Sequence, residues 1–104
     1  MTYENVEKKV KVTMWYILVK LKNMRKWGGA HSELKRVLKS LPNSVSDKKL
    51  IDVAVKELKR LELIGIYKKT GEDHTSLNPS KVKEINQFIE EVKKEMEKNS
   101  YIEL

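Results

Sequence analysis

Lysine side chains recur in the middle of the sequence at spacings that place several of them on one outward helix face. Lys48, Lys49 and Lys56 lie in a segment of helical periodicity, with Ser46 and Asp52 beside them. Ammonium groups neutralise phosphates or reach guanine edges, while a hydroxyl or carboxylate contacts bases or orients a lysine. This pattern favours binding of a polyanion, although the same lysines also suit the solvated face of an amphipathic helix.

Residue patterns that support catalysis are absent from the sequence. There is no cysteine nucleophile, no glycine-rich phosphate loop and no Gly-x-Ser-x-Gly motif, and the acidic residues are mostly interspersed with lysines. The two histidines, His31 and His74, have no cysteine and no obvious third ligand beside them, so they make a poor metal site. We therefore expect no enzymatic activity, no catalytic residues, no cofactor and no metal.

The net charge of +7 is concentrated in the first two-thirds of the chain. Residues 1–30 carry seven Lys or Arg against two acids, and residues 31–64 carry eight against five. Residues 65–79 are balanced, and residues 80–104 carry five basic residues against six acids. A basic field of this kind raises the expectation of a polyanionic partner such as nucleic acid.

The composition is that of one soluble domain spanning residues 1–104. Hydrophobic residues make up 39% of the chain and charged residues 36%, and no run approaches the ~18 consecutive apolar residues of a membrane span. Because the chain has no cysteine, we expect a protein of the reducing cytoplasm, without a membrane partner. Abundant lysine and glutamate beside a single glutamine, Gln87, are typical of thermophile proteins.

Hydrophobic periodicity predicts a mainly α fold with one small β-hairpin. Paired glycines after Trp27 mark a turn, Pro42 stops the second helix, and Ser32 and Ser46 are the predicted N-caps of the second and third helices. The expected bounds are 5–24, 31–41, 46–61 and 80–98 for the helices and 63–78 for the hairpin. This order predicts a winged helix-turn-helix, with a three-helix core, a two-stranded wing and a long C-terminal helix.

The stretch from Val53 to Ile64 resembles the end of the recognition helix and the start of the wing in MarR-like and PadR-like regulators. In those proteins a leucine-rich helix end leads through a glycine into two apolar residues of the first wing strand. Glu62 stands where that glycine usually terminates the helix. We therefore expect either a left-handed Glu62 or a different helix end.

A closer similarity is to small archaeal winged-helix proteins without an assigned function. Those proteins share a Trp-Gly-Gly-x-His-Ser/Thr start of the second helix and a wing that ends in His-x-Ser-Leu-Asn-Pro. This chain carries both motifs, at residues 27–32 and 74–79, and the similarity covers about half of it. The resemblance places His31 and His74 near structural junctions and implies a hydrogen bond between the second helix and the wing.

In a winged helix, the second helix of the helix-turn-helix lies in the major groove of DNA with its N-terminal half toward the base edges. The expected partner is therefore double-stranded DNA, and the expected role is transcription regulation. Glu72 and Asp73 at the predicted wing tip weaken the wing as a DNA contact, because carboxylates repel phosphate. The predicted DNA-binding residues are Lys35, Arg36, Lys39, Ser46, Lys48, Lys49, Asp52, Lys56, Arg60, Lys68, Lys69 and Thr70.

The first predicted helix is apolar on nearly every face between Val12 and Val19, which indicates burial on more than one side. Together with the apolar stripe of the last helix, this suggests a two-fold homodimer whose recognition helices lie about one DNA turn apart. The residues predicted to form the dimer interface are Val12, Trp15, Tyr16, Val19, Phe88, Val92 and Met96.

Two other functions fit the same fold. A protein-interaction winged helix would dock another protein and carry its basic surface incidentally. A sequence-neutral chromatin protein would bind DNA without preference among sequences. Salt distinguishes the first of these from DNA binding, because each phosphate contact makes affinity fall as salt rises. The fold by itself does not choose among these functions.

Overall fold

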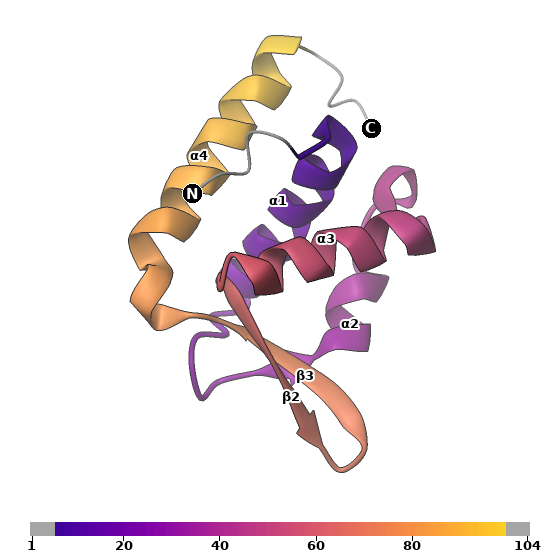
Figure 1. Cartoon of the computed structure of the whole chain (residues 1–104), viewed down its shortest axis with the longest axis vertical. Coiled ribbons are helices and arrows are strands. Elements are labelled where there is room, and N and C mark those ends of the chain that lie inside the picture. The colour runs from indigo at the N-terminus through magenta and orange to yellow at the C-terminus, as the bar shows by residue number, and fades with distance from the viewer. Residues whose placement is uncertain (1–5, 100–104) are drawn as a thin grey trace.

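A computed structural model describes residues 6–99 of the chain, and it confirms a mainly α, winged-helix-like arrangement (Figure 1). Three helices are followed by a β-hairpin and a long C-terminal helix, as the sequence predicts. The elements are α1 (Lys8–Asn23), β1 (Ser32–Glu33), α2 (Leu34–Lys39), the 3-10 turn η1 (Asn43–Val45), α3 (Lys48–Arg60), β2 (Ile64–Lys69), β3 (Glu72–Leu77), the 3-10 turn η2 (Pro79–Lys81) and α4 (Val82–Asn99).

Helix α1 is the central element of the fold. Its residues Met14, Ile17, Leu18 and Leu21 are fully buried. It packs against α3 and α4, and it also contacts α2 and β3 (Figure 1). A helix that is apolar on most faces needs cover on more than one side, and here other elements of the same chain supply that cover.

The packing of α4 against α1 buries part of the predicted dimer interface. Val12, Phe88, Val92 and Met96 are each at most 3% exposed within the single chain, so this part of the prediction was wrong. The indole N–H of Trp15 donates to the Ile89 carbonyl oxygen at 2.9 Å, which fixes α1 against α4. The other predicted interface residues, Trp15, Tyr16 and Val19, are partly exposed, and the dimer itself stays a prediction.

Several predicted helix starts shift in the structure. Ser32 does not cap a helix, because it lies in β1 opposite Thr75 of β3, and α2 begins only at residue 34. Helix α1 begins at Lys8, whereas the predicted start at Asn5 lies outside the described residues. Residues 80 and 81 belong to the turn η2 before α4. None of the helices within residues 6–99 is both long and apolar enough to cross a membrane.

The strands form an antiparallel sheet in the order β1-β3-β2. Strand β3 is therefore central, with the two-residue β1 at one edge and β2 at the other. The segment after α1 is attached to the end of β3, because Gly28 N–H donates to the Leu77 carbonyl oxygen at 2.9 Å and Leu77 N–H donates to that of Lys26 at 2.8 Å. This attachment connects the hairpin to the helical core.

Helices α1 and α3 end in the same way, and neither end contains glycine. Arg25 and Glu62 follow the C-cap residues with φ angles of 59° and 60°, in the left-handed region. After α3, Glu62 N–H donates to the Lys59 carbonyl oxygen and Leu63 N–H donates to that of Leu58, both at 2.9 Å. These two bonds are those of a Schellman motif. The first of the two expectations for Glu62, a left-handed conformation, is thus confirmed.

Replacing Glu62 with glycine should raise the free energy of unfolding by about 1 kcal/mol, because glycine adopts the left-handed conformation without the Cβ clash. Urea denaturation of the wild type and the variant measures the difference. Glu62→Ala is the matched control, since it also removes the carboxylate but keeps the Cβ atom. An equal gain in both variants would mean that charge, and not backbone conformation, accounts for the change.

Candidate nucleic-acid interface

Helix α3 carries the candidate interface, and its first turn is fixed by Asp47. The Asp47 carboxylate accepts a hydrogen bond from the Lys49 backbone N–H at 3.1 Å, as an N-cap does. Ser46, the N-cap predicted from sequence, instead donates its hydroxyl to the Asn43 carbonyl oxygen at 3.0 Å. Asp47 rather than Ser46 caps the helix because the turn η1 occupies the preceding residues. The helix therefore begins two residues later than predicted.

The inward face of α3 is apolar and its outward face is charged. Ala54 and Leu58 are fully buried against the core. The side chains of Lys48, Asp52 and Lys56 are exposed, as is that of Lys49. None of these lysines forms an ion pair with another residue of the described chain, 6–99. Their charges are therefore available to an external anion.

Arg60 differs from these lysines because its charge is already paired. Its guanidinium donates to both carboxylate oxygens of Glu57, at distances between 2.7 and 3.2 Å. The hydrogen bond and the charge of Glu57 raise the pKa of Arg60 above its ordinary value. Although exposed as predicted, Arg60 lies along the C-terminal turns of α3 and would have to leave Glu57 to reach a phosphate.

Helix α2, which precedes α3 in the chain, carries a second set of cations. Lys35, Arg36 and Lys39 are all exposed, and none of them has an ion-pair partner within residues 6–99. The two helices follow each other through the short turn η1. The cations predicted on both helices of the helix-turn-helix therefore belong to neighbouring surface elements.

The wing is electrically balanced, as the sequence predicts. The Lys68 ammonium lies 3.1 Å from an Asp73 carboxylate oxygen. Lys69 and Thr70 are exposed at the tip, and Glu72 lies opposite Lys69 in the hairpin register. Because Lys68 is paired with Asp73, Lys69 is the predicted wing cation that has no ion pair in residues 6–99. The wing therefore contributes less positive charge than either helix.

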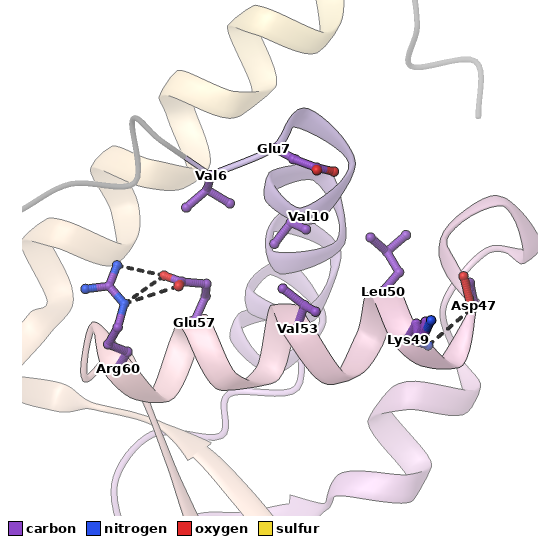
Figure 2. A pocket seen from close by; sticks show the side chains of 9 residues that line it. All are labelled: Val6, Glu7, Val10, Asp47, Lys49, Leu50, Val53, Glu57 and Arg60. Carbon is purple, nitrogen blue, oxygen red and sulfur yellow. Dashed lines mark hydrogen bonds and ion pairs between the residues drawn. The ribbon is translucent and has the colours of Figure 1, made fainter.

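A groove between α3 and the beginning of α1, lined by apolar and charged side chains, was not predicted from the sequence (Figure 2). Its volume is about 630 Å³. Val53, which is 47% exposed, points into it from the middle of α3, and its outward position among polar neighbours was the only signal for it in the sequence. The residues that line the groove are Val6, Glu7, Val10, Asp47, Lys49, Leu50, Val53, Glu57 and Arg60.

The two histidines lie in direct contact. The Nδ1 atoms of His31 and His74 are 3.0 Å apart, which is a hydrogen-bond distance. His31 immediately precedes β1 and His74 lies in β3, so the bond joins the segment before α2 to the wing. The hydrogen-bonding role implied by the resemblance is present, although His31 is not itself helical. Within residues 6–99 no three His, Cys, Asp or Glu side chains gather in a group suited to a metal ion.

In comparisons with protein families, with curated proteins and with solved structures, nothing matched this chain. The function is therefore inferred from the exposed residues of the chain and their charges. All twelve residues predicted to bind DNA are exposed, and those on α2 and in the first half of α3 carry most of the unpaired positive charge. Such a surface suits a polyanion with regularly spaced phosphates.

Replacing Asp47 with alanine should lower the free energy of unfolding by about 1 kcal/mol, because the N-cap hydrogen bond to Lys49 is lost. Ser46→Ala should change it by less than about 0.5 kcal/mol, since that side chain is exposed and does not cap the helix. Thermal or urea denaturation of both variants provides the measurement. A larger loss in Ser46→Ala than in Asp47→Ala would contradict the assignment of the cap.

Proposed function

We propose that this protein binds double-stranded DNA through α3, with α2 contacting the phosphate backbone. The observation that carries the proposal is the set of exposed cations on these two helices, which, apart from Arg60, have no ion-pair partners within residues 6–99. In a winged-helix arrangement these helices are the pair that meets DNA. The net charge of +7 supports the same partner.

The exposed residues of α3 suit distinct roles in a major groove. Lys49 and Lys56 lie on the outward face, from which an ammonium group reaches guanine O6 and N7. Asp52 lies between them on that face, where a carboxylate accepts from the cytosine amino group. Lys48 and the cations of α2 would contact phosphates, which position the protein without specifying sequence.

A role in transcription regulation follows as the finer part of this proposal. The similarity of residues 53–64 to MarR-like and PadR-like regulators supports it. In such a regulator, two copies would pair so that their recognition helices fall about one DNA turn apart. Trp15, Tyr16 and Val19 on α1 are the members of the predicted dimer interface that are still partly exposed.

Docking of another protein is the second candidate function, and the groove beside α3 is the observation that favours it (Figure 2). Its apolar residues include Val53, one of three large apolar side chains in residues 6–99 that are more than 40% exposed. A protein partner in this groove would bury the apolar side chains together with charges of both signs, so its affinity would depend less on salt than DNA binding does. DNA binding would instead weaken steeply as salt rises.

Changing Lys48, Lys49 and Lys56 together to alanine should weaken duplex binding at least about tenfold at about 100 mM salt. The slope of log affinity against log salt should also fall by about 0.9 for each phosphate that the variant no longer neutralises. Fluorescence anisotropy with random and genomic duplexes across a salt series measures both quantities. Wild-type binding that is steep in salt but equal for all duplexes would identify a sequence-neutral chromatin protein.

The matched control changes Lys83, Lys93 and Lys94 to alanine, which removes the same charge from exposed positions on α4. This control should retain most of the affinity, because α4 is not part of the helix-turn-helix. An equal loss in both triple variants would mean that diffuse charge, and not α3, holds the DNA. Absence of any wild-type binding at low salt would contradict the proposed function and leave protein docking as the candidate.

Val53 lines the groove beside α1 but is still 47% exposed, so in a complex with α3 in the major groove it should contact a thymine methyl group. On the duplex that the protein prefers, replacing thymine with uracil should weaken binding about fourfold, which corresponds to about 0.8 kcal/mol for one buried methyl-sized group. Val53→Ala should abolish this difference. Val82→Ala, at a similarly exposed valine on α4, should preserve it; persistence of the full difference in Val53→Ala would assign the methyl contact to another residue.

A further inference from the structure

The contact between His31 and His74 is built into the outer surface of the sheet. Their rings meet edge to face, with centroids 4.9 Å apart. The Tyr67 ring lies 5.7 Å from that of His31, and its hydroxyl forms a 3.2 Å hydrogen bond with Ser76. Gly65 allows this placement, because a Cβ atom there would lie 2.5 Å from the Tyr67 hydroxyl oxygen. The imidazole pair thus lies next to the Tyr67 ring, whose position is fixed by the hydrogen bond to Ser76.

The pair has room for only one added proton while the hydrogen bond is kept. When both rings are neutral, one Nδ1 donates and the other accepts. A first proton enters at the distant Nε2 of the donor ring and leaves a charge-assisted bond between the same two atoms. A second proton must occupy the accepting Nδ1. At 3.0 Å, two N–H groups and two positive charges then face each other, and the bond is replaced by repulsion.

Positively charged groups near His31 add to this repulsion. Partial desolvation, followed by the positive charges of His74, Lys69 and Lys26, lowers the pKa of His31 below its ordinary value of about 6.5. In the strand register, Glu33 of β1 lies opposite His74, and Glu72 of β3 lies opposite Lys69. From β2, the Tyr67 hydroxyl and Lys69 are the ionisable groups that alternation places on one face of the strand.

The segment joined by the pair has few other attachments to β3. Strand β1 has only two residues in register with β3, and α2 follows it without a linker. The base of the preceding loop is held separately, because the Ser76 hydroxyl donates to the Gly28 carbonyl oxygen at 2.8 Å. Breaking the imidazole hydrogen bond would therefore loosen β1 and the start of α2 while the loop base and the hairpin stay attached.

We propose that His31 and His74 form an acid-sensitive latch that ties β1, and through it the start of α2, to the central strand of the wing. The latch is closed when the pair carries no proton or one proton, and it opens when the second proton binds. Because His31 binds its proton less readily in the folded chain than in the unfolded chain, the latch stabilises the fold fully above pH about 6.5. Its contribution is lost as the pH falls below that value. The latch is a property of the fold and does not depend on the proposed function.

The test is an NMR titration of ¹⁵N-labelled protein, in which His31 and His74 are the only histidines. The two imidazoles should titrate in two separate steps, because the second proton meets the repulsion of the first across the 3.0 Å contact. Between about pH 7 and pH 5, hydrogen exchange of the β1 amides, corrected for its intrinsic pH dependence, should accelerate at least about tenfold. The amides between β2 and β3 should keep their protection, which distinguishes local opening from global unfolding.

The variants His31→Gln and His74→Gln are the matched controls. In each variant the hydrogen bond between the two imidazoles is absent, so the acid-induced acceleration of β1 exchange should disappear. Two wild-type histidines that titrate together in a single step, with β1 protection unchanged down to about pH 5, would overturn the proposal. The wild-type titration is decisive by itself if neither variant folds.

Discussion

Burial of α1 on several sides is the constraint on which the other elements depend. Each fully buried Leu, Ile or Met side chain contributes roughly 1.5–3 kcal/mol of hydrophobic free energy, and the middle of α1 has several of them in succession. No single neighbour covers a helix that is apolar on most faces, so α3 and α4 both pack against it. The position of α3, and with it the direction of its charged face, follows from this packing.

The candidate interface is shaped by which cations have partners inside the chain. Arg60 and Lys68 are as exposed as their neighbours, but each is held by a carboxylate, from the same helix for Arg60 and from the facing strand for Lys68. Such surface pairs contribute little to stability, typically about 0–1 kcal/mol. Their larger effect is on the distribution of charge, because they reduce the positive field at the end of α3 and on the wing. The exposed cations without such a partner are distributed over both α2 and α3.

The small sheet is held together by side-chain and loop contacts as well as by strand pairing. Strand β1 is too short to be stable by backbone pairing alone, and it is supplemented by the imidazole contact and by the loop bonds to the end of β3. The same contacts connect the start of α2 to the wing. The geometry of the helix-turn-helix and that of the wing are therefore coupled through residues at the β1 edge of the sheet.

Periodicity, breakers and charge in the sequence were sufficient for the class of fold, the order of its elements and the exposed faces of the helices. For Glu62 the resemblance left two helix ends open, and the left-handed one is present, because a chain that must reverse there without glycine has few other conformations. These features are local, since each depends on residues within a few positions of one another.

Only the tertiary structure decided which surfaces meet. Periodicity marks Val12 and Phe88 as residues to be buried, but it does not state whether a partner subunit or the chain's own α4 covers them. It likewise could not show that Ser32 pairs in a strand, or that Val10 and Val53 line one groove. Contacts between distant residues depend on how the elements pack in three dimensions, and a pattern along the chain carries no information about that packing.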